Sequence, residues 1–108
     1  MARRQLDVTR YEAEMVLIPT ERGTRQVVRV IVFGPNFPER AVLPEILVDD
    51  LCAEEVSISR DLKSIRGYFS EVPKDGARIV VRYGDSQEGI VSEPFAHKYV
   101  RPLPTECA

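Results

Sequence analysis

The side chains that could support catalysis are few, and they centre on one histidine. His97 is the only histidine in the chain, and Ser92 and Glu93 lie close to it in sequence. A serine–histidine–acid triad would have to use His97 as the base that accepts the serine proton. No serine, however, lies in the glycine-flanked turn that presents such a nucleophile. We therefore expect a surface histidine, with a small hydrolase using His97 only as a second alternative.

A second candidate is the segment Gly84–Gly89, which reads Gly-Asp-Ser-Gln-Glu-Gly. Its Gly-Asp-Ser triplet is found in an esterase nucleophile block, but the other blocks of such an enzyme are missing. Turn residues dominate the segment, which predicts a polar hairpin loop. Binding residues are often carried on loops. A binding site at the loop end would involve Asn36, Glu39, Arg40, Asp85, Ser86, Gln87 and Glu88.

Four carboxylates, Asp49, Asp50, Glu54 and Glu55, fall within seven residues. Calcium takes six to eight oxygen ligands, so the cluster could supply some of them. The spacing matches no calcium loop, however, and the cluster contains no glycine that would let the chain turn tightly around an ion. We expect a solvated turn, no metal site and no cofactor.

The two cysteines, Cys52 and Cys107, are far apart and form no Cys-x-x-Cys unit. With His97 they fall short of the four soft ligands that a structural zinc needs. We expect Cys52 to be a small buried residue, and a disulfide to Cys107 stays an alternative. The N-terminus lacks the apolar stretch of an export signal, and no apolar run is long enough to span a membrane. These features predict a cytoplasmic protein.

Arginines give the N-terminal third of the chain a local positive charge. Arginine outnumbers lysine by 12 to 3, and its planar guanidinium suits phosphate and carboxylate partners. The net charge of -2 excludes a strongly basic nucleic-acid binder, and Glu12, Glu14 and Glu21 are interleaved with the arginines. Nucleic-acid contact is therefore the first alternative function. It would use Arg10, Arg22, Arg25 and Arg29.

The chain that must position these residues has the length and composition of one globular domain. It has 108 residues, of which 44% are hydrophobic and 30% charged. We therefore expect a single domain over residues 1–108, without low-complexity segments. Residues 1–25 are its less certain part, and 102–108 form a disordered tail after the prolines at 102 and 104.

Short apolar runs separated by turn residues predict an all-β fold. The β-branched runs 27–33 and 79–83 are the clearest strands. Further strands are expected at 42–48, interrupted by Pro44, and at 56–59, 65–70 and 90–95. Turns are expected at 21–24, where Gly23 can adopt positive φ, and at 73–76. The run within 8–18 suits a strand or a short helix; we favour a strand that ends at Pro19.

About seven short strands at this regular spacing are typical of an immunoglobulin-like sandwich. The cysteine–tryptophan–cysteine core of antibody domains is absent, because the chain has no tryptophan. The predicted fold is therefore an immunoglobulin-like β-sandwich without a disulfide core.

The order of elements from 28 to 99 resembles the IPT/TIG family of immunoglobulin-like domains. The resemblance begins with an apolar strand that ends in Gly34-Pro35-Asn36-Phe37 and continues with the Val-rich segment 46–48. The later strands, Gly89, and Phe95 with Tyr99 follow the same order. The proline-led opening strand of the family is missing. The resemblance implies a binding or spacer module without catalytic residues.

These observations favour a non-catalytic protein-interaction or accessory module that binds a protein partner or associates with itself. No membrane partner is expected. The predicted binding surface is either the loop end or an exposed strand edge near Pro44, because an open edge accepts a partner strand by backbone pairing. For the edge, lysine or proline at Leu43 or Leu47 is expected to abolish association.

Overall fold

The computed structural model describes residues 4–37, 43–49, 51–84 and 87–96. Within these ranges the chain is all-β, as predicted, with nine strands and no helix. No helix there is long and apolar enough to cross a membrane. The predicted tail, 102–108, lies outside the described residues. The strands are β1 (Arg4–Gln5), β2 (Arg10–Thr20), β3 (Gly23–Phe33), β4 (Glu45–Val48), β5 (Leu51–Cys52), β6 (Glu54–Ile58), β7 (Ser64–Phe69), β8 (Ile79–Tyr83) and β9 (Gln87–Ile90).

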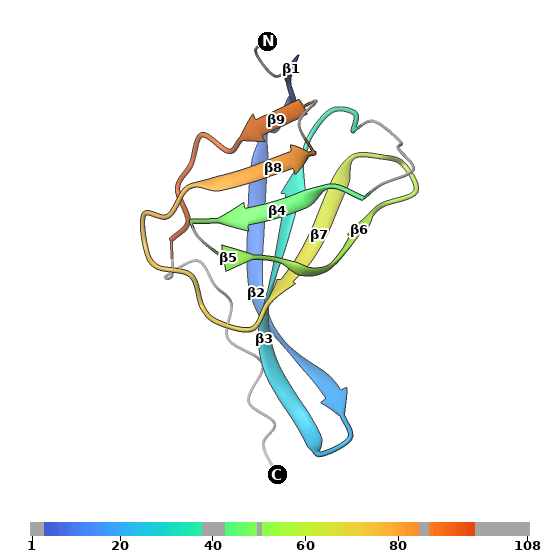
Figure 1. The fold of residues 1–108 in the computed structure, drawn as a ribbon, viewed down its shortest axis with the longest axis vertical. Helices are drawn as coiled ribbons and strands as arrows, with labels where there is room; N and C mark the ends of the chain where they lie inside the picture. The colour runs from blue at the N-terminus through green and yellow to red at the C-terminus, as the bar shows by residue number, and fades with distance from the viewer. Residues whose placement is uncertain (1–3, 38–42, 50, 85–86, 97–108) are drawn as a thin grey trace.

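The strands form two sheets (Figure 1). The first has the order β1-β9-β8-β4-β5, and the second has the order β2-β3-β7-β6. All pairings are antiparallel except that of β1 with β9, which is parallel. The shortest connection between the sheets is Ala53, between β5 and β6, whose N–H donates to the Ile46 carbonyl across 2.9 Å.

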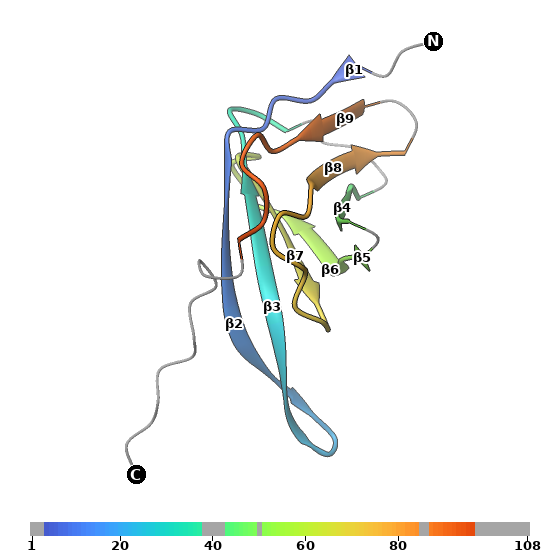
Figure 2. The ribbon, with the colours of Figure 1, turned by 90° about the vertical axis from the view of Figure 1, so that its left-hand side faces the viewer.

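The two sheets face each other and enclose one apolar core (Figure 2). Alternation along the strands places every second side chain inside. In β8, for example, Ile79, Val81 and Tyr83 are buried, whereas Val80 and Arg82 are only partly covered. The fully buried aliphatic residues of the core come from both sheets: Val28, Val30, Val32 and Ile65 from the second, and Ile46, Val48, Ile79 and Val81 from the first.

The run within 8–18 is a strand, not a helix, and it continues further than predicted. β2 pairs with all 11 residues of β3, from Arg10 opposite Phe33 to Thr20 opposite Gly23. The prediction that Pro19 ends the strand is wrong, because Pro19 pairs with Thr24.

Proline is tolerated at this position because its nitrogen faces away from β3. The Gly34 N–H donates to the Lys63 carbonyl across 3.0 Å. Hydrogen-bonded pairs alternate along antiparallel strands, so the even-numbered residues of β3 bond to β7 and the odd-numbered ones to β2. The β2–β3 register then directs the even-numbered residues of β2 toward β3 and the odd-numbered ones, including Pro19, toward the open edge. A proline there removes no hydrogen bond from the ladder.

The last hairpin also begins earlier than predicted. β9 starts at Gln87, which pairs with Tyr83, so the predicted loop 84–89 is shorter and the predicted strand 90–95 is not formed. Gly89 allows this arrangement, because a Cβ at this residue would lie 2.6 Å from the Leu6 carbonyl oxygen. The N-terminal segment thus packs closely on β9. Within it, β1 pairs with the edge of β9 that does not face β8.

Two further predictions about the first sheet are wrong. β4 follows Pro44 and lies between β8 and β5, so it is an inner strand and not an exposed edge. Cys52 is exposed rather than buried. It ends β5, a two-residue strand at the edge of the first sheet, where Leu51 and not Cys52 packs against the core.

Candidate functional site

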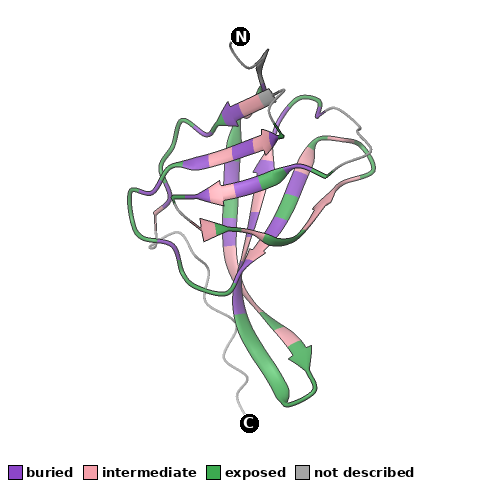
Figure 3. Ribbon diagram, in the orientation of Figure 1, coloured by how far each residue is buried: buried purple, intermediate pink, exposed green. Residues whose placement is uncertain are grey.

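β2 and β3 project beyond the rest of the second sheet as a two-stranded arm (Figures 1 and 2). β7 pairs with β3 only from Val28 to Phe33. Residues 17–26, which we call the arm, therefore have no third strand among the described residues. The arm is largely exposed, whereas in the body of the protein the same two strands alternate buried residues with exposed or partly covered ones (Figure 3). Two-stranded hairpins are marginally stable in water, so contact with a partner would stabilise the arm.

Local hydrogen bonds define the tip of the arm. The Thr20 hydroxyl donates to the Gly23 carbonyl across 3.0 Å, and the Arg22 N–H donates to the Thr20 hydroxyl oxygen across 3.3 Å. Gly23 has a φ of 119°, which glycine adopts at little cost. The predicted turn with positive φ at Gly23 is confirmed. These hydrogen bonds hold the turn that contains Arg22.

The outer edge of β2 is the one long, regular edge in the described part of the chain. β1 and β5 have two residues each, and β6 has an irregular register between Glu54 and Ser57. Short or bulged edges resist pairing with another strand. By the alternation described above, the backbone groups of Ala13, Met15 and Leu17, and the carbonyl of Pro19, face the outer edge of β2.

Apolar side chains border this edge where β2 enters the arm. Leu17 has 54% of its surface exposed. Val16 and Ile18 point to the opposite face of the strand and are only partly covered. A strand added to this edge would therefore meet apolar side chains on both of its faces.

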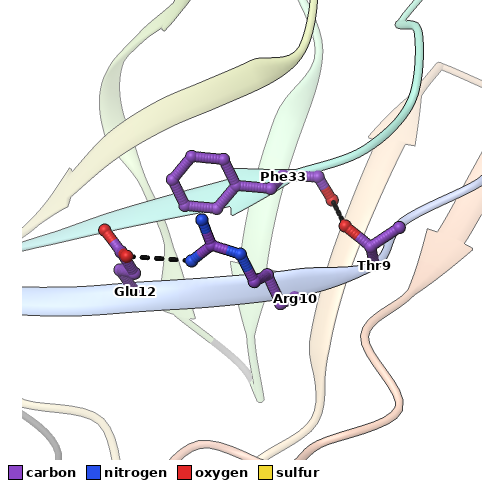
Figure 4. Close-up of polar contacts among 4 residues, drawn as sticks. All are labelled: Thr9, Arg10, Glu12 and Phe33. Carbon is purple, nitrogen blue, oxygen red and sulfur yellow. Dashed lines mark hydrogen bonds and ion pairs between the residues drawn. The ribbon is translucent and has the colours of Figure 1, made fainter.

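Arg10 is occupied by contacts within the protein (Figure 4). Its Nη1 lies 2.8 Å from the Glu12 carboxylate, and its guanidinium carbon lies 3.9 Å from the centroid of the Phe33 ring. Thr9 fixes the start of β2, because its hydroxyl donates to the Phe33 carbonyl across 3.0 Å. The cation–π contact and the ion pair together hold the guanidinium against the body.

Two of the other three arginines proposed for nucleic-acid contact also have carboxylate partners. Arg25 lies 3.4 Å from Glu54, and Arg29 forms an ion pair with Glu14, the residue opposite it in the sheet. Arg29 is partly buried, and its Nε has no hydrogen-bond partner among the described residues. Arg22 is exposed at the tip. The four arginines therefore lie on a surface of mixed charge.

The residues proposed for the loop end are only partly described. Asn36 is exposed beside the turn 59–63, where the Phe37 N–H donates to the Leu62 carbonyl across 2.7 Å. Gln87 and Glu88 belong to strand β9. The other proposed residues, Glu39, Arg40, Asp85 and Ser86, lie outside the described residues.

The turn beside Asn36 is held by the Asp61 carboxylate. It accepts hydrogen bonds from the Ser59 hydroxyl across 2.6 Å and from the Lys63 N–H across 3.1 Å. Both bonds favour the charged carboxylate, so they lower the pKa of Asp61. Side-chain hydrogen bonds therefore define the conformation of this turn.

The candidate catalytic and metal-binding groups do not form a site in the described part of the chain. Ser92 and Glu93 are exposed, and His97 lies outside the described residues. In the acidic cluster Asp49, Glu54 and Glu55 are exposed, and Asp50 is outside the described residues. Over 4–37, 43–49, 51–84 and 87–96, no three histidine, cysteine or carboxylate side chains are placed to hold a metal ion.

A hollow of about 340 Å³ lies beside the part of β2 that belongs to the body. It is lined by Tyr11, Glu12, Ala13, Glu14, Arg29, Ile31 and Glu93. Three carboxylates and one guanidinium make its charge negative. Two of these carboxylates already have cationic partners, since Glu12 pairs with Arg10 and Glu14 pairs with Arg29.

In comparisons with known proteins, no family model matches the chain, and no curated protein or solved structure is significantly similar to it. The function must therefore be inferred from the arm, its open edge and the hollow.

The strands and the turn of the arm are predicted from the sequence, but a binding role for the arm is not. One signal was available. Leu17 and Ile18 directly precede Pro19 near the end of a strand. Apolar side chains next to a strand proline indicate an edge strand, and an apolar edge strand is an interaction surface.

Proposed function

We propose that this protein is a non-catalytic interaction module, an immunoglobulin-like sandwich that binds a protein partner through the arm and the open edge of β2. The observation that carries the proposal is an 11-residue edge strand, regular along its length, that ends in an exposed two-stranded arm. No other described edge combines this length with a regular register.

The order of the strands supports the immunoglobulin-like assignment. Strands β2, β3, β7 and β6 correspond in order to strands A, B, E and D of an immunoglobulin domain. Strands β4, β8 and β9 correspond to C, F and G, which form the facing sheet. Seven strands make up this core, and the two-residue strands β1 and β5 lie at the edges of one sheet.

Packing around Gly34 supports the narrower resemblance to IPT/TIG domains. Phe37 is fully buried, and a Cβ on Gly34 would lie 2.8 Å from the Phe37 ring and 2.5 Å from the Asp7 carbonyl oxygen. The Gly-x-Asn-Phe sequence thus has a physical basis here, because only glycine leaves room for the ring. We keep the family assignment as part of the proposal.

Binding would use the backbone for affinity and side chains for selection. A partner strand beside β2 could bond to the N–H and C=O groups that face outward, and Leu17 would give it an apolar contact. Glu12 and Glu14 would reject strands with carboxylates at the opposing positions. The expected partner is therefore a protein strand that brings apolar and cationic side chains.

Two leucines with the same exposure allow a matched test. Leu17 on the arm is 54% exposed, and Leu43 before β4 is 55% exposed. A photoreactive amino acid replaces each leucine in turn, the protein is irradiated in cells of its source, and crosslinked products are separated by mass. We expect a crosslinked polypeptide from position 17 and none from position 43.

The opposite outcome at either position would be informative. Equal crosslinking from both positions would indicate nonspecific contact, and crosslinking from position 43 alone would favour the region near Pro44. Absence of any product at position 17 would overturn the proposed function. Circular dichroism of each variant confirms that the fold is intact before the comparison.

Nucleic-acid contact through the arginines stays an untested alternative. Charge reversal at Arg22 and Arg25 would weaken such binding and reduce its salt dependence. If the unmodified protein fails to retard DNA or RNA at low salt, the alternative is removed.

A further inference from the structure

We infer that the outer face of the second sheet holds a binding site for a carboxylate group, centred on Arg66. The site goes beyond the proposed function, because it lies on a face of the sheet and not on the arm or along the edge of β2. β3, β7 and β6 lie side by side there (Figure 1), and a second hollow, of about 140 Å³, lies over them. We call this hollow the Arg66 pocket; it is lined by Ile31, Ser57, Ile58, Ser59, Ser64 and Arg66.

The register of the three strands brings the pocket residues together. Arg66 lies opposite Ile31 of β3 on one side and opposite Ser57 of β6 on the other. Residues opposite each other in antiparallel strands point to the same face, and Ser64, two residues before Arg66, points there too. Ile65 between them is buried in the core, so the pocket lies on the face of the sheet that is turned away from the first sheet.

Arg66 differs from the arginines in the other strands. Its side chain is exposed, and within the described part of the chain its guanidinium has no ion pair and no hydrogen bond. The arginines of β2, β3 and β8 each pair with a glutamate: Arg10, Arg25, Arg29 and Arg82. A guanidinium carries five N–H donors in a planar fork, and those of Arg66 are available to a ligand.

Two serine hydroxyls beside Arg66 are available as well. Ser57 and Ser64 are partly covered, and neither hydroxyl has a hydrogen-bond partner among the residues that the structure describes. The Ser59 hydroxyl, by contrast, donates to the Asp61 carboxylate across 2.6 Å and accepts from the Ser64 N–H across 3.1 Å. The pocket therefore presents one guanidinium and two hydroxyls whose hydrogen bonds are unmade.

The carboxylates nearby do not use these donors. Glu12, Glu14 and Glu54 share this face of the sheet, and each pairs with another arginine. Asp61 accepts hydrogen bonds within its own turn, from the Ser59 hydroxyl and from the Lys63 N–H. The donors of the pocket thus remain for a ligand, and hydrogen bonds from a guanidinium are strongest to an anion.

Size and charge favour a carboxylate over a phosphate. The 140 Å³ of the pocket is the space of roughly four or five water molecules at about 30 Å³ each, which suits a carboxyl group on a short stem. Ile31 and Ile58 would contact that stem. A phosphate monoester carries about -1.5 to -2 charges at pH 7, whereas one guanidinium lines the pocket and the Asp61 carboxylate lies one hydrogen bond from its wall. The ligand is therefore a monoanionic carboxylate, either the end of a glutamate side chain or a short carboxylic acid.

A titration followed by two-dimensional NMR tests the site. Isotope-labelled protein is titrated at constant ionic strength with N-acetyl-glutamate α-amide, propionate, N-acetyl-glutamine amide or inorganic phosphate. We expect saturable shifts of the backbone amides of Ser57, Ser64 and Arg66 from both carboxylates, and none from the glutamine derivative, whose side chain is neutral. Tighter binding of the glutamate derivative than of propionate would identify a peptide ligand, and equal binding would show that the carboxylate and its stem suffice.

Three arginine variants measure the contribution of the guanidinium. R66A should weaken binding of the glutamate derivative roughly tenfold or more, because it removes charge-assisted hydrogen bonds. R66K keeps the charge without the planar fork and should bind several-fold more weakly than the unmodified protein. R78A is the matched control, because Arg78 is also exposed and unpaired among the described residues but precedes β8 of the other sheet. It should leave binding unchanged, and unchanged amide shifts outside the pocket confirm that each variant is folded.

Four outcomes would overturn the inference. These are shifts that do not saturate, an equal response to the glutamine derivative, an R66A variant that binds like the unmodified protein, and phosphate binding tighter than either carboxylate. An equal loss in R66A and R78A would also overturn it, because it would indicate attraction to general positive charge. None of these measurements involves the arm, so crosslinking at position 17 decides the proposed function separately.

Discussion

Gly67 provides a quantitative test of how the two sheets pack. It lies in β7 of the second sheet, opposite Val30, and is buried. A Cβ at this residue would lie 2.6 Å from the Ala53 Cβ and 3.2 Å from the Ile46 Cδ1 of the first sheet. The backbone of Gly67 has no positive φ, so the glycine is required by space alone. We therefore predict that G67A destabilises the protein and that A53G relieves the effect.

The magnitude follows from the distances. Carbon atoms in contact lie about 3.5–4.0 Å apart, so the Ala53 methyl would have to retreat by about 1 Å. β7 is bonded on both sides, to β3 and β6, and cannot move away alone. Overpacking of this kind costs about 1–3 kcal/mol, partly offset by about 0.5–1 kcal/mol because alanine suits a strand better than glycine. The net loss expected for G67A is about 1–2 kcal/mol.

A double-mutant cycle separates the clash from other effects. A53G alone should cost about 1–2 kcal/mol, through a lost methyl contact and a more flexible chain. In the double variant the added methyl takes the space of the removed one, so the two losses should fall short of additivity by about 1 kcal/mol or more. Urea denaturation of the four proteins measures the cycle. Additive losses, or a more stable G67A, would show that the sheets do not meet at this residue as described.

Three further changes test other parts of the structure. Y11F removes a hydroxyl that donates to the Pro94 carbonyl and accepts from the Ala96 N–H; we expect a loss of about 1–3 kcal/mol in urea denaturation. The pKa of Asp61 is lowered from 3.8 in the folded protein, so its stabilising effect is present above that pH and lost as the pH falls below it. D61N should therefore flatten the acid part of a stability–pH profile, and an unchanged profile would contradict the role given to Asp61. P19A adds an N–H that faces away from β3 and changes no bond of the β2–β3 ladder, so the free energy of unfolding should change by about 1 kcal/mol or less in urea denaturation, whereas a larger loss would contradict the outward direction of Pro19.

The strands inside the sheets were predictable because their signal is local. The runs 27–33 and 79–83 are β-branched, and the structure places β3 and β8 over them. The turn at Gly23 was equally local. β9 was not predictable in this way, because its polar residues pair with β8 and lie beside the N-terminal segment, a contact between distant parts of the sequence.

The charge pattern of the candidate site needed the register as well as the residue types. Interleaved glutamates and arginines were visible in the sequence, but the ion pair of Arg29 with Glu14 depends on the β2–β3 alignment. A shift of this register by one residue would move every side chain of β2 to the opposite face. The local positive charge predicted from the arginines therefore becomes part of a surface of mixed charge once the strands are paired.

Pro19 shows why strand ends and strand edges are hard to distinguish from sequence. A proline stops a strand when its nitrogen points to a neighbour, and it is harmless when its nitrogen points outward. The alternation of hydrogen bonds along β3 decides which case applies, and β7, far along the chain, sets that alternation. The same alternation determines which residues of β2 can bind another strand. Since Pro19 faces outward, the residue that looked like the end of the strand lies on its outer edge.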